Sequence, residues 1–502
     1  MDVYSIIQML LTRATTLEMI QKEDEIYARN QILSLLSLHG FPKQITIETE
    51  LEIPELLALL EQYAINNGLI HDVLAEKEIF LSKIMNVLVL KPSEVNRLFY
   101  DKYDRDKTEA TQFFYQLSQN SNYIQTKSIA KNINYRFFSP YGELDITINL
   151  SKPEKDPKRI ALEREAKSNS INYPKCLLCV ENEGYAGRIN HPARSNHRLI
   201  RLELTDEPWF LQYSPYVYYN EHCIVLSGEH RDMRIDRLTF ARLLEFVEKF
   251  PHYFLGSNAD IPIVGGSILS HDHYQGGQYE FAMAKADADF AFQLRDYPSI
   301  QAETLKWPLS VIRLRGEKVE ELVDAADEIL AKWIDYSDPE VQIQAYTGES
   351  RHNTITPIAR KRDEKYEIDL VLRNNRTTKE YPYGIFHPHE DVHHIKKENI
   401  GLIEVMGLAV LPARLETELK EIEKYLLGAK HHVAGYHLLW AQELKDKYGE
   451  NIAPHSVKEI LQREVGAKFL RALEDAGVFK RDEQGLKAFN RFIHLFSISD
   501  NE

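Results

Sequence analysis

Near Asn134 the hydrophobic pattern of this 502-residue chain changes from one typical of helices to one typical of strands. Before this point apolar residues recur every three or four positions, as in the stretch 3–11. After it, the segment NYRFFSPYGELDITINL (134–150) carries aromatic and β-branched residues around a glycine turn. Helical patterns return in LETELKEIEKYLL and SVKEILQREVGAKFLRAL. The pattern therefore predicts an α+β chain with helices at both ends of a mixed β middle.

The β middle is expected to contain several short strands and one helix. Strand patterns occur at 198–204, 214–228, 262–269 and 277–284. Asp236 is expected to cap the helix RLTFARLLEFVEKF, because an aspartate before a helical pattern accepts hydrogen bonds from the first turn. Farther on, HNTITPIAR and YEIDLVLR flank the charged turn KRDEK and predict a hairpin.

Two further helix starts are predicted from capping residues. Ser93 precedes EVNRLFYDKY and has the character of an N-cap. Ser456 and Glu459 have capping-box spacing at the start of the last long helical pattern. A third helix, IPELLALLEQYAINNGL, has Pro54 near its start, where proline is tolerated.

Composition excludes several classes of protein. The chain has 61 Lys and Arg against 76 Asp and Glu, a net charge of -15. An acidic chain of this kind argues against broad nucleic-acid binding and against docking on an anionic membrane, which need a positive surface. Three cysteines are too few for a secreted disulfide scaffold, and neither a signal-peptide pattern nor a membrane-spanning apolar stretch is evident. We therefore expect a cytoplasmic protein that binds neither nucleic acid nor membrane.

The segment IVGGSILSHDHYQGGQYEF (263–281) carries the clearest chemical signal. On a strand, His271, His273 and Gln275 would share one face, with Asp272 and Tyr274 on the other. A neutral imidazole can attack phosphorus, and an adjacent amide can donate a hydrogen bond to a phosphoryl oxygen as charge develops.

The His-x-His pattern alone is weak. A chain of this length with 19 histidines is expected to contain about one His-x-His sequence by chance. This chain also contains a second one, His387-Pro388-His389. Gln275 and the glycine pairs at 265–266 and 276–277 make chance unlikely here. From these residues alone, catalysis, a structural role and a metal pair all remain open.

A second segment, PKCLLC (174–179), has the spacing of half a zinc site. A redox-active C-x-x-C usually begins a helix in a βαβ unit, whereas here Pro174 precedes the pair and no strand does. Two unliganded cysteines in a turn are the alternative. The candidates for the remaining zinc ligands are Cys223, His222, His230, His271 and His273.

Taken together, these segments resemble a known family. HDHYQ is similar to the His-x-His-x-Gln signature of the galactose-1-phosphate uridylyltransferase branch of the histidine-triad superfamily. CLLC, GEHRD and HDHYQ occur in the order of that family. SPYGELDITINLSKPEKDP, NEGYAGRINHPARSNHR and YVYYNEHCIVLSGEH extend the resemblance, which is to the second, bacterial class and covers about residues 130 to 420.

The resemblance implies uridylyl exchange between UDP-glucose and galactose 1-phosphate, giving glucose 1-phosphate and UDP-galactose. It implies two histidine-triad-like halves, each a sheet with helices on it, and a homodimer. The expected organisation is a helical N-terminal domain at 1–125, a first half at 126–300, a second half at 301–420 and a helical segment at 421–502. Two in-line displacements would give ping-pong kinetics.

The resemblance also implies roles for individual residues. His273 would be the nucleophile that holds the uridylyl group, and Gln275 would hydrogen-bond the transferred group. A structural zinc ion would be bound by Cys176, Cys179, His230 and His271, with no organic cofactor. The implied substrate contacts are Asn220, Asn258, Gly266, Ser267, Ser270, Lys155 and Lys158.

Two departures from the first class of the family affect the expected site. Asp272 stands where that class has proline, and it would either bond a neighbour on the opposite face or raise the basicity of the histidines. Lys155 and Lys158 stand where that class has arginines, so bidentate phosphate binding is in question. A second metal, held in some first-class members by C-terminal histidines, is not predicted: YEIDLVLR is expected to be the matching strand and FHPHEDVHH (386–394) a loop.

Two other functions are compatible with the sequence. A dinucleoside-polyphosphate phosphorylase of the same superfamily would use His273 on a different nucleotide. A non-catalytic protein could bind a sugar nucleotide without a covalent intermediate. The CLLC pair and the long N-terminal helical part favour the uridylyltransferase.

Overall fold

The fold is described from a computed structural model that covers residues 2–45, 47, 50–151, 172–266, 268–429, 432–449 and 452–498. It is a mixed α+β protein, as predicted. The chain forms two compact units. Unit 1 consists of Met1–Lys131, Ser151–Val217 and Glu221–His230, and unit 2 of Asn132–Leu150, Tyr218–Asn220 and Arg231–Glu502. The four-part division expected from the sequence stays a prediction.

Unit 1 begins with helices, which the N-terminal hydrophobic pattern predicts correctly. They are α1 (Val3–Thr16), α2 (Glu25–Leu35), α3 (Ile53–Asn66), α4 (Leu74–Val87), α5 (Pro92–Tyr103), α6 (Lys107–Asn120) and α7 (Thr126–Ile129). Pro54 lies in the first turn of α3, as expected. The prediction that Ser93 is an N-cap is wrong, because α5 already begins at Pro92 and Lys91 is its N-cap. Proline suits the first turn, since its fixed φ is helical and its missing N–H would have no partner there.

The described residues of unit 1 also form the strands β3 (Ile200–Leu204), β4 (Glu207–Tyr213) and β5 (Cys223–Ser227). They pair antiparallel in chain order. Asn96 on α5 donates a hydrogen bond to Leu199 O at 2.8 Å and accepts one from Arg201 N at 2.8 Å. This single amide satisfies backbone groups beside β3 and so fastens α5 to the strand.

Unit 2 contains a larger antiparallel arrangement in the order β7-β6-β13-β14-β10-β9-β8. Its strands are β6 (Phe254–Gly256), β7 (His273–Gly277), β8 (Ala288–Gln293), β9 (Gln301–Leu305), β10 (Val311–Gly316), β13 (Asn353–Arg362) and β14 (Lys365–Asn374). The hairpin predicted from HNTITPIAR and YEIDLVLR is confirmed as β13 and β14.

Two predicted strands around the histidine motif are wrong. Residues 262–266 and 268–269 form no strand; Gly265 makes an isolated bridge with Ala259. Ile263 has a φ of 75°, which ends the extended conformation, and a Cβ on Gly265 would lie 2.4 Å from Ala259 O. The segment 277–284 is not a strand either, because β7 ends at Gly277 and a 3-10 turn covers Ala282–Lys285.

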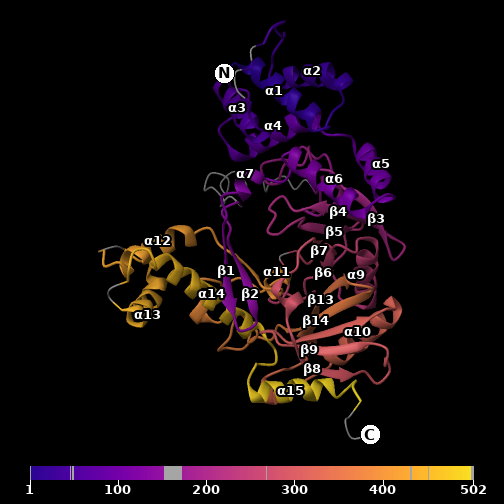
Figure 1. The fold of residues 1–502 in the computed structure, drawn as a ribbon, viewed down its shortest axis with the longest axis vertical. Coiled ribbons are helices and arrows are strands. Elements are labelled where there is room, and N and C mark those ends of the chain that lie inside the picture. Colours follow the sequence, from indigo (N-terminus) through magenta and orange to yellow (C-terminus); the bar gives the residue numbers. More distant parts are fainter. Residues whose placement is uncertain are drawn as a thin grey trace. The chain divides into compact units, whose positions relative to one another are not determined.

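One face of the unit 2 sheet is covered by two helices, α9 (Arg237–Lys249) and α10 (Val319–Ile334), which lie beside β13 and β14 (Figure 1). Asp236 caps α9 as predicted, accepting a hydrogen bond from Thr239 N at 3.1 Å. On α10, Leu322 lies close to Gly316 of β10, so the helix packs over that end of the strand. The strand register places Tyr274 on this covered face, and His273 and Gln275 on the opposite one.

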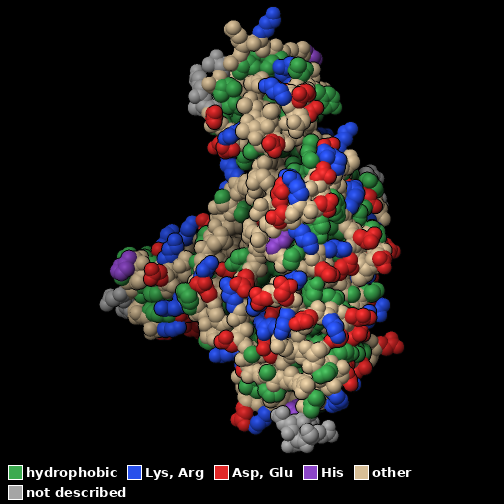
Figure 2. All heavy atoms as spheres, turned by 45° about the vertical axis from the view of Figure 1, so that its right-hand side comes forward, with side chains coloured by type: hydrophobic (Ala, Val, Ile, Leu, Met, Phe, Trp, Pro, Cys, Tyr) green, Lys and Arg blue, Asp and Glu red, His purple; other side chains and the backbone are tan. Residues whose placement is uncertain are grey.

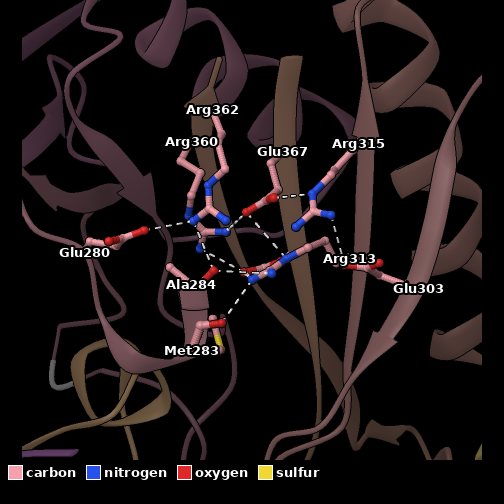
Figure 3. A network of polar contacts seen from close by, with 10 residues as sticks. Glu280, Met283, Ala284, Glu303, Arg313, Arg315, Arg360, Arg362 and Glu367 are labelled. Atoms are coloured by element: carbon pink, nitrogen blue, oxygen red, sulfur yellow. Dashed lines mark hydrogen bonds and ion pairs between the residues drawn. The ribbon is translucent and has the colours of Figure 1, made fainter. Parts of the chain in front are cut away.

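The face that carries His273 also carries a group of buried charges on β10, β13 and β14 (Figure 3). Arg313 binds Asp369 through two hydrogen bonds, at 2.6 and 2.9 Å, and Arg360 binds Asp369 at 2.8 Å. Glu367 bonds to both Arg360 and Arg315. Because Arg313 faces Asp369 and Arg360 faces Glu367 in the strand register, each pair fits only one alignment of its two strands.

A second sheet of unit 2 joins β1 (Ile133–Ser139), β2 (Gly142–Ile148) and β15 (Leu408–Leu411), with β15 parallel to β2. The helices of the C-terminal part are α11 (Leu402–Val405), α12 (Leu415–Leu426), α13 (Leu438–Tyr448), α14 (Val457–Ala476) and α15 (Glu483–Ile493). Gly466 lets α14 approach β1 closely, because a Cβ there would lie 2.3 Å from the Phe137 ring. The predicted capping box of α14 does not form, since Ser456 donates instead to Ala453 O.

The outer surface carries charges of both signs. Acidic and basic side chains are interspersed on the face drawn in Figure 2, so the net charge of -15 is not gathered into one patch there. Within the ranges that the structure describes, no helix combines the length and apolar character needed to cross a membrane.

Candidate active site and metal centre

The predicted nucleophile, His273, is the first residue of β7 and is buried. Its Nδ1 atom lies 2.8 Å from the backbone oxygen of His271. A carbonyl can only accept, so Nδ1 carries the proton and Nε2 carries the lone pair. Among the described residues, Nε2 of His273 has no hydrogen-bond partner. The ring is therefore held in the tautomer that a nucleophilic Nε2 requires.

Electrostatics keep this ring neutral. Burial lowers the pKa of His273 to about 4; the hydrogen bond to His271 O opposes this effect, and the charge of a protonated His271 ring would add to it. At neutral pH the ring therefore keeps its lone pair. His271 itself precedes β7, so the expectation that His271, His273 and Gln275 share one face of a single strand holds only for His273 and Gln275.

The predicted substrate contacts differ in how far they are buried. Asn258 is buried, its Oδ1 accepts a hydrogen bond from Leu402 N at 2.9 Å, and its side chain lies against Gly266. Asn220 is exposed and donates to Gln278, while Ser270 is exposed just before the motif. Three other predicted contacts, Lys155, Lys158 and Ser267, lie outside the described residues.

The predicted metal ligands come together. The ligand atoms of Cys176, Cys179, His230 and His271 all lie within 4.8 Å of one another. In unit 1 the two sulfur atoms are 3.5 Å apart, and Cys179 Sγ lies 3.2 Å from His230 Nδ1. Backbone N–H groups of Cys176 and Leu178 point at the sulfurs, at 3.3 Å each. Two thiols and two imidazoles are a donor set that fits a divalent metal ion.

Asp272 bonds to neighbours, as one of the two sequence interpretations predicted. Its backbone N–H donates to Arg231 O at 2.8 Å, and its carboxylate lies 3.4 Å from Arg231 Nε and 4.0 Å from Arg242 on α9. Its side chain therefore faces the helix-covered side, away from His273.

Comparison with known proteins gives the family. A family model for the N-terminal domain of galactose-1-phosphate uridyl transferase matches residues 18–232, and one for the C-terminal domain matches 245–442. The chain belongs to the galactose-1-phosphate uridyl transferase family. This confirms the family resemblance seen in the motifs.

Relatives match almost from end to end. A galactose-1-phosphate uridylyltransferase of Clostridium perfringens is 52% identical over 493 residues, 97% of this chain and 98% of the relative. Galactose-1-phosphate uridylyltransferase 1 of Streptococcus pneumoniae is 52% identical over 495 residues, 99% of this chain and 100% of the relative. A solved structure, yeast Ap4A phosphorylase Apa2, is 13% identical with a TM-score of 0.30, covering 61% of this chain and 90% of that chain. Only the relatives with high identity bear on function.

In this member of the galactose-1-phosphate uridyl transferase family, the C-terminal histidine pair lies on a loop. YEIDLVLR forms part of β14, as predicted, whereas His387 and His389 precede the 3-10 turn Glu390–Val392. The His387 ring bonds to Pro388 O and to Asn399 Oδ1. The His389 ring bonds to Ile385 O, and the backbone N–H of His389 donates to the Asp475 carboxylate.

Two residues of the site went unnoticed in the sequence. Asn182 and His191 lie behind the cysteine pair and are almost fully buried. The only signal for Asn182 is its position three residues after Cys179. His191 carries no local signal, because its contact with Asn182 depends on how the intervening loop folds.

Proposed function

We propose that this protein transfers a uridylyl group between UDP-glucose and galactose 1-phosphate, producing glucose 1-phosphate and UDP-galactose. The observation that carries the proposal is the hydrogen bond from His273 Nδ1 to His271 O, which leaves Nε2 of a neutral ring as a nucleophile. Relatives 52% identical over nearly the whole chain are galactose-1-phosphate uridylyltransferases, which supports the same substrates here.

In the first half-reaction, Nε2 of His273 attacks the α-phosphorus of UDP-glucose. A nitrogen–phosphorus bond forms, and the bond from this phosphorus to the oxygen of glucose 1-phosphate breaks. The ring keeps its Nδ1 proton and becomes cationic, and His271 O stabilises that charge through the same hydrogen bond. A sugar-phosphate leaving group needs little protonation, so no acid is required at this step.

In the second half-reaction, a phosphate oxygen of galactose 1-phosphate attacks the same phosphorus. The nitrogen–phosphorus bond breaks and His273 returns to its neutral form. Gln275, on the His273 face of β7, is proposed to donate to a phosphoryl oxygen as charge develops. Asn258, with its Oδ1 held by Leu402 N, is proposed to direct its amide N–H groups at the substrate.

We further propose that the Cys2His2 group holds zinc. Four protein ligands leave no open position, so the ion would act as a structural clamp on His271 and hence on the carbonyl that orients His273. We also propose that the enzyme works as a homodimer in the cytoplasm. Light scattering of the purified protein at micromolar concentration tests the dimer, and a monomer mass would contradict it.

Intact mass spectrometry after mixing with UDP-glucose alone tests the reaction. The expected result is one added uridylyl group, located on His273 by peptide mapping and removed by galactose 1-phosphate. His273→Ala should form no adduct, and His455→Gln, at an exposed histidine, should form it normally. Absence of an adduct on folded, metal-loaded protein contradicts the covalent mechanism; an adduct formed only with adenine dinucleotides favours a phosphorylase.

A further inference from the structure

The C-x-x-C loop of unit 1 is bridged from behind by one amide side chain. Asn182 Nδ2 donates hydrogen bonds to Cys176 O at 2.9 Å and to Cys179 O at 2.8 Å. The two carbonyls that it spans belong to the two cysteines of the metal group. Asn182 is 2% exposed, so both bonds are shielded from water.

A buried histidine fixes the orientation of this amide. His191 Nε2 lies 2.7 Å from Asn182 Oδ1. Because both N–H groups of the amide are donated to carbonyls, its oxygen faces His191, and His191 Nε2 must carry the proton. Burial, together with the charges of Arg188 and Arg194, lowers the pKa of His191 to about 4, so the ring is a neutral donor at pH 7.

The loop that carries these two residues is itself anchored. Glu183, next to Asn182, accepts a hydrogen bond from Leu199 N at 2.8 Å and binds Arg201 on β3 at 3.1 Å. Arg188 and His191 pair through their backbones, and Arg188 also reaches Tyr173 O at 2.8 Å. The amide of Asn182 is therefore held on a fixed support rather than on a free turn.

We propose that Asn182 and His191 are positioning residues for the metal centre: they hold the Cys176 and Cys179 backbone in the conformation that directs both sulfur atoms at one ion. Neither residue belongs to the group of proposed metal ligands. This inference rests on the proposal that the Cys2His2 group binds zinc. The physical basis is that residues behind the ligands keep them in the binding geometry, so the metal does not have to order the loop itself.

Zinc affinity of the full-length protein, measured by competition with a chromophoric chelator, tests the proposal. Asn182→Ala is expected to raise the Kd for Zn²⁺ by about 10- to 100-fold, the usual effect of losing an interaction behind metal ligands. His191→Ala should weaken zinc binding in the same direction, and His191→Gln should restore much of it, because glutamine also offers an N–H donor. Asn190→Ala, at an exposed asparagine bonded to Arg188 in the same loop, is the matched control.

Urea unfolding of the metal-free and the zinc-loaded forms separates positioning from general stabilisation. A merely structural role would destabilise both forms equally and leave the Kd unchanged. A Kd for Asn182→Ala and for His191→Ala within threefold of the unmodified protein would overturn the proposal. If Asn182→Ala does not fold, the two His191 variants decide the question. Failure of the unmodified protein to bind Zn²⁺ would instead contradict the metal centre itself.

Discussion

His273 Nδ1 and the backbone oxygen of His271 are 2.8 Å apart, so the proposed nucleophile is oriented by the main chain of a proposed metal ligand. One hydrogen bond thus connects the metal group with the reacting atom. Any change that frees His271 should also free the His273 ring to rotate or to change tautomer.

Metal removal is therefore expected to impair the first half-reaction. Protein stripped by a strong chelator should form the uridylyl adduct at least about 10-fold more slowly, and added Zn²⁺ should restore the rate. Cys179→Ser should reproduce the loss together with a low zinc content, measured by elemental mass spectrometry. Cys223→Ala should keep its zinc, because Cys223 lies outside the metal group. An unchanged rate of adduct formation in fully stripped protein would contradict this connection.

Loss of the Gln275 amide should slow the chemistry more than it weakens substrate binding. Gln275→Ala is expected to lower kcat by roughly 10²- to 10³-fold, the scale for removal of one donor to a developing negative charge, with a small change in KM. Steady-state kinetics and rapid-quench adduct formation measure both effects. Gln293→Ala, at an exposed glutamine on β8, serves as the control. A rise in KM with unchanged kcat would assign Gln275 to binding alone.

The buried charge group on β10, β13 and β14 should be costly to break. Asp369→Asn removes the carboxylate that Arg313 and Arg360 share in a site closed to water, so the charge of Glu367 has to balance both arginines. We expect a decrease of roughly 3–5 kcal/mol in the free energy of unfolding, measured by urea denaturation. Glu483→Gln, which removes an exposed pair with Lys487, should change it by less than about 1 kcal/mol. A similarly small change for Asp369→Asn would show that these ions are not mutually dependent.

The buried charge group on β10, β13 and β14 should also make the stability of the protein sensitive to acid. Burial would raise the pKa of Asp369, but Arg313 and Arg360 outweigh it and hold the pKa below the ordinary value of 3.8. A lowered carboxyl pKa contributes stability above the unfolded value, and this contribution is lost as pH falls below 3.8 toward the folded value. Urea midpoints between pH 5 and pH 3 should therefore fall more steeply in the unmodified protein than in Asp369→Asn. If the urea midpoint falls equally steeply with pH in both proteins, the acid sensitivity does not come from Asp369.

Local patterns were sufficient for much of the fold. The N-terminal helices, the α9 cap at Asp236 and the β13–β14 hairpin depend on residues a few positions apart, so spacing and turn chemistry reveal them. Capping predictions failed at Ser93 and Ser456, where a neighbouring proline or a different backbone partner took over. The strand predicted at 262–269 failed because Ile263 has a positive φ and Gly265 lies close against Ala259 O, which apolar content does not reveal.

The sequence by itself determined which chemical groups the proposed site can use: the ordered segments CLLC, GEHRD and HDHYQ supply two thiols, three imidazoles and an amide. Tertiary structure decided how these groups are held. It selected the His271 carbonyl as the partner of His273, brought His191 to Asn182, and joined Arg313 to Asp369 across 56 positions. Motif spacing records which residues are neighbours along the chain but not which of their atoms meet. The Arg313–Asp369 contact arises where strands distant in sequence pack together and bury their polar groups in pairs.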